Sequence, residues 1–176
     1  MSYCAYVASL GEDWSNPNKY YHDKEYGVPL SDDNELFERL VLEINQAGLS
    51  WNTILNKRAN FKQAYDHFVI EVVANYTEEK IAELLQDKGI IRNRLKVHAA
   101  VYNAQQIIVL QQTHGSFKNW LDQQDFSTID KAVKLFKKQF KFVGVEIVKE
   151  FLMSTAYMEG AHDIDCPCYR KVSPRI

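Results

Sequence analysis

The 176-residue sequence predicts an all-α fold. Apolar residues recur every three or four positions through most of the chain, and no segment of useful length alternates apolar and polar residues as a half-buried strand would. Only four prolines and seven glycines are present, so few positions interrupt a helix. The chain contains no internal repeat, and its length suits a single domain over residues 1–176 with a full hydrophobic core.

In the first half of the chain, the spacing predicts helices over residues 32–47, 50–57, 58–68 and 78–86. The first of these begins with acidic residues, which favour a helix N-terminus, and Gly48 follows its end. Thr77 precedes the last of them and can accept a hydrogen bond from its first turn.

In the second half, the spacing predicts helices over residues 91–112, 116–123, 130–138 and 145–158. Gly115 separates the first two of these helices, and the tight turn "FKFVG" over residues 140–144 joins the last two. Residues 1–30 and 159–176 have little periodicity, so we expect irregular ends.

These ends hold all three cysteines and two of the five histidines. The candidate ligands for a shared metal ion are Cys4, His22, His162, Cys166 and Cys168. Four of them would make a Cys₂His₂ set, which is typical of structural zinc, and a closed set of four leaves no position for water. The alternative is that these thiols and imidazoles share no site. The Cys4–His22 spacing leaves this choice open, because it is not a standard zinc-finger spacing.

Charge and composition restrict the class of protein. No apolar run approaches the roughly 20 residues that a membrane span requires, and no secretory signal opens the sequence. We therefore expect a cytoplasmic protein, in which clustered cysteines bind metal more readily than they form disulfides.

The net charge is −2, but lysines and arginines gather in residues 90–96 and 130–144. This pattern allows one face to meet a polyanion, but charge alone favours the alternative of ordinary solvated helix faces.

Glu43 lies on the apolar side of the predicted helix over residues 32–47. A buried carboxyl group has to be paired or hydrogen-bonded, and its pKa tends to be raised. The alternative is that Glu43 is exposed or forms a salt bridge. Tyr20, Tyr21, Tyr26 and Trp51 lie nearby in the sequence. Aromatic faces with one carboxylate suit a flat heterocycle that carries positive charge or N–H donors, although such aromatic residues more often belong to a core.

Several sequence motifs follow one another along the chain. They are "CAYV", "YYHDKEYGVPLSDDNELFERLVLEINQAGLSWNTILNKR", "GIIRNRLKVHAAVYNA", "GSFKNWL", "FKFVG" and the terminal H-x-x-x-C. With these motifs the chain resembles bacterial 3-methyladenine DNA glycosylase I from Cys4 to about Cys168. The resemblance implies a helix-hairpin-helix glycosylase-like bundle whose termini are joined by a structural zinc ion. It also implies a monomer that hydrolyses the N-glycosidic bond of 3-methyladenine in double-stranded DNA and releases the free base.

Carried over motif by motif, the resemblance assigns the zinc ligands Cys4, His22, His162 and Cys166 and leaves Cys168 without a role. It makes Glu43 the catalytic residue that reads the base edge, with Tyr21 and Trp51 against the base. The implied DNA contacts lie around the turn, at Lys137, Lys138, Lys141, Phe142, Val143 and Gly144.

The sequence departs from the family pattern at four places. Tyrosines stand where the family usually has tryptophan, at Tyr6 and Tyr26, and Asn18 replaces a tyrosine. Gln139 replaces the glycine before "FKFVG", and the loop after "GSFKNWL" is shorter than usual. The competing hypothesis is therefore a member of the same fold that binds DNA or a modified base with altered specificity or without turnover.

Overall fold

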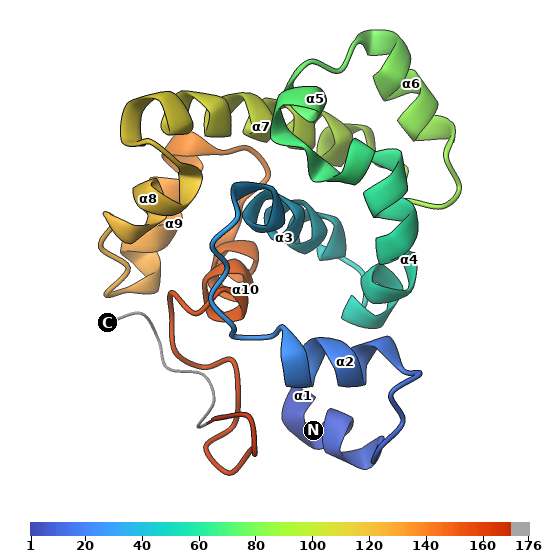
Figure 1. Cartoon of the computed structure of the whole chain (residues 1–176), viewed down its shortest axis with the longest axis vertical. Helices are drawn as coiled ribbons and strands as arrows, with labels where there is room; N and C mark the ends of the chain where they lie inside the picture. The colour runs from blue at the N-terminus through green and yellow to red at the C-terminus, as the bar shows by residue number, and fades with distance from the viewer. Residues whose placement is uncertain (170–176) are drawn as a thin grey trace.

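A computed structural model describes residues 1–169, and within this range every regular element is helical, as the sequence predicts (Figure 1). The elements are α1 (Tyr3–Ser9), α2 (Pro17–Lys24), α3 (Asp33–Gln46), α4 (Trp51–Ala64), the 3₁₀ helix η1 (Asp66–Phe68), α5 (Ile70–Ala74), α6 (Glu78–Gln86), α7 (Arg94–His114), α8 (Phe117–Asp122), α9 (Ile129–Gln139) and α10 (Val145–Ser154). None of the helices in this described part has the length and apolar character needed to cross a bilayer.

The helix starts follow from local chemistry. Before most helices a short polar side chain accepts a hydrogen bond from a backbone N–H group of the first turn, which satisfies one of the donors left open there. These capping residues are Ser2, Asn16, Asp32, Ser50, Thr77, Asn93, Ser116 and Thr128. The cap at Thr77 confirms the sequence prediction.

Helix α3 lies at the centre of the molecule, with α4, α7, α8 and α10 packed against it (Figure 1). Its residues from Leu36 to Asn45 are all buried, including the charged Glu38, Arg39 and Glu43. A helix buried on all sides is normally apolar throughout, so each buried charge on α3 requires an explanation.

Several predicted boundaries are wrong. The helices predicted over residues 50–57 and 58–68 form one helix, α4, because nothing between them breaks helical backbone, and a separate 3₁₀ turn follows it. Helix α5 is absent from the sequence prediction, because five residues are too few for a periodic signal. The last helix ends at Ser154 instead of residue 158.

The N-terminal end is more ordered than the sequence predicts. Residues 1–30 contain α1 and α2 in place of the expected irregular segment. Asn16 followed by Pro17 is a recognisable start signal for α2, because proline is well suited to the first helical position. The C-terminal end is irregular from residue 159 to residue 169, as predicted, and residues 170–176 lie outside the described residues.

The N-terminal helices meet the last described segment of the chain, up to residue 169, at one end of the molecule. Helices α1 and α2 lie beside the segment that follows α10 (Figure 1). The Asp163 backbone N–H donates to Cys4 Sγ over 3.3 Å, and the Ser2 hydroxyl donates to the Asp163 carboxylate. The Gly27 N–H also donates to the Ser154 carbonyl over 3.0 Å, which ties the segment after α2 to the end of α10.

Candidate functional site

A cavity of about 430 Å³ lies between the N-terminal helices, α3, the start of α4, and α10. Its lining consists of Tyr3, Tyr21, Tyr26, Glu43, Gln46, Trp51, Glu146 and Glu150. The lining is rich in aromatic rings and carboxyl groups, and among the described residues it contains no lysine or arginine. Such a cavity suits a flat, electron-poor ligand.

Glu43 is the deepest carboxyl group of the cavity, with 3% of its surface exposed. Within the described residues no hydrogen bond or ion pair holds it. Burial raises the pKa of Glu43 to about 8, the nearby Arg39 opposes this rise and Glu150 adds to it. Arg39 is engaged elsewhere, since it donates to the Ser154 carbonyl over 3.1 Å and lies 5.0 Å from the Tyr21 ring centroid. The unliganded carboxyl group is therefore mostly protonated at neutral pH.

Tyr21 and Trp51 form an aromatic corner of the cavity, with ring centroids 5.1 Å apart and planes inclined at 56°. Tyr21 comes from α2, and Trp51 is the first residue of α4, which Ser50 caps. The Tyr21 hydroxyl and the Trp51 indole nitrogen are buried without hydrogen-bond partners in the described protein. Buried polar atoms are normally paired, so these two unpaired groups beside the cavity require an explanation.

The other aromatic residues singled out in the sequence divide into two groups. Tyr26 lines the cavity and donates a hydrogen bond to Glu150 Oε2 over 3.1 Å. Tyr20, in contrast, is 54% exposed and does not line the cavity. Asn18 is buried beside the cavity, where its amide donates to the Asn52 side chain over 2.7 Å.

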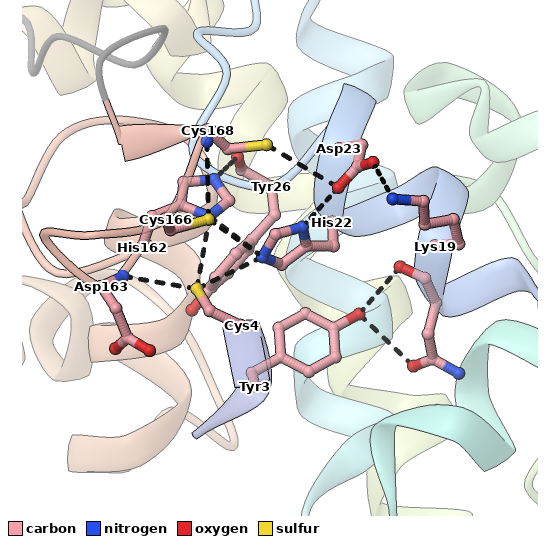
Figure 2. A network of polar contacts seen from close by, with 11 residues as sticks. Tyr3, Cys4, Lys19, His22, Asp23, Tyr26, His162, Asp163, Cys166 and Cys168 are labelled. Atoms are coloured by element: carbon pink, nitrogen blue, oxygen red, sulfur yellow. Dashed lines mark hydrogen bonds and ion pairs between the residues drawn. The ribbon is translucent and has the colours of Figure 1, made fainter. Parts of the chain in front are cut away.

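Four side chains from opposite ends of the sequence form a second cluster, shown in Figure 2. Cys4, His22, His162 and Cys166 each offer one ligand atom, and all four atoms lie within 4.8 Å of one another. His22 Nε2 and His162 Nδ1 are 3.3 Å apart, and the four nitrogen–sulfur distances run from 3.3 to 3.8 Å. The cluster could hold a metal ion.

Neighbouring groups orient these ligand atoms. His22 Nδ1 lies 2.7 Å from Asp23 Oδ1, and His162 Nε2 lies 2.9 Å from the Tyr26 carbonyl oxygen (Figure 2). Each contact engages the ring nitrogen that faces away from the cluster, so the other nitrogen can ligate a metal. Burial raises the pKa of the Cys4 thiol to about 12, and a bound cation would counter this effect.

Cys168 lies next to the four-residue cluster. Its N–H donates to Cys166 Sγ over 3.4 Å, and its own thiol lies 3.7 Å from Asp23 Oδ1. With His22 and Asp23 it makes a second group of closely spaced donors, but that group shares His22 with the first.

The turn over residues 140–144 joins α9 to α10. Asn103 of α7 holds this turn, because its side chain accepts from the Lys141 N–H over 2.8 Å and donates to the Lys141 carbonyl over 3.1 Å. Phe142 adopts a φ of 59°, which is unfavourable for a residue other than glycine. Gly144 caps α10 without a side-chain hydrogen bond, so the helix begins with open N–H groups.

Residues 14–134 match the family model described as methyladenine glycosylase. The chain belongs to the methyladenine glycosylase family. It is 36% identical over 170 residues to DNA-3-methyladenine glycosylase 1 of Escherichia coli, covering 85% of this chain and 89% of that protein. It is 32% identical to DNA-3-methyladenine glycosylase of Haemophilus influenzae, covering 84% and 90%.

Among solved structures, the chain resembles the 3-methyladenine DNA glycosylase I of Staphylococcus aureus, described in a study of the structural basis of 3-methyladenine recognition. The TM-score is 0.80 at 31% identity, and the match covers 94% of this chain and 97% of that one. The family resemblance inferred from the sequence motifs is thereby confirmed.

In this methyladenine glycosylase the residues singled out in the sequence gather at three places. Glu43, Tyr21 and Trp51 line the cavity, and the four candidate metal ligands form one cluster. The third group surrounds the turn, where Lys137, Lys138, Lys141 and Phe142 are exposed and Gly144 is the N-cap of α10. The Val143 side chain is 5% exposed and packs in the core, so it can offer only backbone groups.

Sequence reasoning missed the other cavity residues and the residue that holds the turn. Tyr3, Gln46, Glu146 and Glu150 line the cavity, and Asn103 binds the turn from another helix. Gln46 and Asn103 fall inside the quoted motifs, and Gln46 lies three residues after Glu43 on the same helix, which is a signal that could have been used. No motif includes Tyr3, Glu146 or Glu150, which reach the cavity only through contacts between helices distant in the sequence.

Proposed function

We propose that this chain hydrolyses the N-glycosidic bond between 3-methyladenine and deoxyribose in alkylated double-stranded DNA and releases the free base. The observation that carries the proposal is the cavity itself. Within the described residues, Glu43 is buried without a hydrogen-bond partner, and so are the hydroxyl of Tyr21 and the indole nitrogen of Trp51, which line the same cavity. The relatives named as 3-methyladenine glycosylases identify the base that such a cavity would take.

The pocket selects a damaged base through charge. Methylation at N3 makes adenine cationic, and a cation next to Glu43 lowers the carboxyl pKa from its raised value. Binding the lesion therefore displaces the proton from Glu43 and recovers a carboxylate that pairs with the base. Normal adenine offers no such compensation. The rings of Tyr21 and Trp51 add a cation–π contribution, which is stronger in a desolvated site.

The same charge weakens the bond that breaks. A cationic purine is a good leaving group, so the enzyme has little need of a strong general acid. The protein extrudes the nucleotide at a cost of a few kcal/mol, lower for a damaged base, and holds the base against Glu43. Glu43 is the proposed catalytic residue in this sense, because it contacts the base whose bond is broken.

For the second cluster we propose a structural zinc ion held by Cys4, His22, His162 and Cys166. Tetrahedral zinc with ordinary bond lengths requires about 3.3–3.4 Å between two nitrogen ligands and about 3.5–3.6 Å between nitrogen and sulfur. The observed 3.3 Å and 3.3–3.8 Å fit this geometry. Four protein ligands leave no open position, so the ion would fasten the two ends of the chain and take no part in the reaction.

The turn between α9 and α10 is the proposed hairpin that binds DNA phosphates. Its proposed ligands are the N–H groups of Phe142, Val143 and Gly144, which lie at the positive end of the α10 dipole. Lys137 and Lys138 in the last turn of α9, and Lys141 in the turn, add positive charge. We also propose that the chain forms a single domain and acts as a monomer in the cytoplasm.

The test is chromatographic analysis of the bases released from methylated DNA. The proposed function predicts free 3-methyladenine in the released fraction. The competing hypothesis is a protein that binds DNA without turnover, and it draws on the altered turn, in which Gln139 replaces a glycine and Phe142 has a positive φ. It predicts that DNA is bound and that no free base is released.

A further inference from the structure

Helix α10 contributes two carboxyl groups to the wall of the cavity, at Glu146 and Glu150. They are four residues apart and therefore lie on one face of the helix. Glu146 is exposed, whereas Glu150 is partly buried. Neither residue belongs to the motifs that identify the family, and the roles assigned to Glu43, Tyr21 and Trp51 leave both unused.

Glu150 is held in place by a donor. The Tyr26 hydroxyl donates to Glu150 Oε2 over 3.1 Å, and Tyr26 itself is only 8% exposed. The Tyr26 ring is fixed between Tyr21 and Tyr3, at centroid distances of 5.6 and 5.7 Å. The hydrogen bond occupies one carboxylate oxygen, and within the described residues no hydrogen bond engages the other. Tyr26 stands where the family usually has tryptophan, so the hydrogen bond from its hydroxyl to Glu150 depends on a residue at which this chain departs from the family pattern.

Glu150 lies on the helix that runs from the proposed phosphate-binding turn to the wall of the cavity. The proposed phosphate grip ends at Gly144, where α10 begins, and Glu43 contacts the base in the depth of the cavity. The deoxyribose connects phosphate and base, so it has to lie between these two points. The carboxyl groups of Glu146 and Glu150 line the wall along that path.

We propose that Glu150 is the general base of the reaction and receives a proton from the water that attacks C1′ of the deoxyribose; this inference rests on the proposed glycosylase function. As the water oxygen bonds to C1′, the C1′–N9 bond breaks and its electron pair neutralises the cationic base. One proton of the water passes to the Glu150 carboxylate. The products are neutral 3-methyladenine, a sugar with a C1′ hydroxyl group, and a protonated Glu150.

The other two carboxyl groups are less suited to this step. Glu43 is protonated at neutral pH before the lesion binds, and afterwards it is paired with the base. Glu146 is exposed, and no hydrogen bond within the described residues fixes its orientation. Glu150 is partly buried, which raises its pKa, but the fixed donor Tyr26 opposes this rise and favours the carboxylate.

The proposal predicts a pH dependence. Burial raises the pKa of Glu150, the Tyr26 hydrogen bond and Lys149 oppose this rise, and Glu146 adds to it. A general base acts only when ionised, so the rate of bond cleavage should fall as the pH falls through this pKa. The titratable and charged groups around Glu150 are Glu146 and Lys149 of α10, Glu43 of α3, and the tyrosines Tyr3, Tyr21 and Tyr26 that line the same cavity.

The experiment measures single-turnover release of 3-methyladenine from methylated DNA by the full-length protein across pH 5 to 9, with free-base affinity as a second readout. Glu150→Gln should slow release by about 10²-fold, the lower end for general-base catalysis, and should abolish the acidic fall in rate. Its affinity for free 3-methyladenine should stay near that of the wild type, because the base contacts Glu43. Glu146→Gln removes the same charge from the same wall and should keep the acidic fall.

A second variant tests the same role of Glu150 in case Glu150→Gln does not fold. Tyr26→Phe keeps the ring and removes the hydrogen bond, so the acidic fall should move to higher pH and the rate at neutral pH should drop. Wild-type rate and pH profile in Glu150→Gln would overturn the inference while leaving the glycosylase function intact. A wild-type protein that releases no base would overturn the function and the inference with it.

Discussion

Glu43 is a residue whose burial opposes folding. Its surroundings raise the carboxyl pKa to about 8 from an ordinary 4.5, mainly through desolvation, which the charge of the nearby Arg39 offsets only in part. A structural carboxyl group would normally be paired. Glu38, on the same helix as Glu43, is paired with Arg58 of α4 over 2.7 Å. The unpaired state of Glu43 is therefore better explained by a ligand than by the fold.

The free energy of unfolding should reflect this. Between pH 4.5 and pH 8 the folded protein retains a proton on Glu43 that the unfolded chain has released, so this group makes the protein less stable as the pH rises. Glu43→Gln does not titrate. The stability of the variant relative to wild type should increase by up to about 1.4 kcal/mol per pH unit in this range.

Urea unfolding of both proteins at pH 5, 6, 7 and 8 measures this difference. A constant difference at all four values would mean that Glu43 is paired in solution and that its pKa is ordinary.

At the scale of elements, sequence periodicity is sufficient for the long amphipathic helices and insufficient where tertiary contacts decide. The helix predicted over residues 32–47 agrees closely with α3, because its apolar spacing and its Gly48 stop are local signals. The buried face of α7 cannot be found in this way. Leu95 and Val109 fall on a helical line of mostly apolar residues, yet they are 68% and 49% exposed, while Val97 and Ile107 are buried.

The same limit applies to the turn between α9 and α10. Its motif is visible in the sequence, but its support by Asn103 is not. Asn103→Ala should cost about 1–3 kcal/mol of stability, because the Lys141 N–H and carbonyl lose their partner, and it should weaken DNA binding. Gln111→Ala on the same helix removes a hydrogen bond to Asp33 and serves as the control. It should reduce stability while leaving DNA affinity unchanged, and equal DNA affinities in both variants would mean that the turn does not bind DNA.

The lysines of α9 give a further prediction. Replacing Lys137 and Lys138 with glutamine should weaken binding to undamaged and damaged DNA alike, and should reduce the salt dependence by roughly one slope unit for each phosphate that a lysine no longer neutralises. Lys131 lies at the other end of α9 in an ion pair with Asp125, so Lys131→Gln should leave the slope unchanged. The same slope in all three variants would place the DNA on another face.

At the scale of the whole molecule, the metal cluster joins segments that start and end the chain. The sequence supplies the candidate ligands, and the family motif selects four of the five. Spacing alone cannot show that Cys4 and His162 lie together, because α3 to α10 separate them in the sequence. The fold brings them together through the contacts of α1 and α2 with the segment after α10.

A structural ion adds its binding free energy to that of folding. We therefore expect one zinc ion per chain by elemental analysis, and a clear fall in melting temperature for Cys166→Ser. Cys168→Ser is the matched control, two residues away and outside the proposed ligand set, and it should retain the zinc. A metal-free wild-type protein of unchanged stability would refute the zinc site.

The most direct test of base recognition by Glu43 is calorimetric titration of free 3-methyladenine into wild type and Glu43→Gln at neutral pH. We expect saturable binding by the wild type and an affinity lower by roughly one to two powers of ten in the variant. The proton that Glu43 holds can pass to a ring nitrogen of the neutral base, and the resulting charge-assisted hydrogen bond, which glutamine cannot form, contributes about 1.5–3 kcal/mol. Zinc content and fold should be the same in both proteins. Equal affinity in the two proteins would contradict this role, because Glu43 would then be a buried carboxyl group with no part in recognising the base.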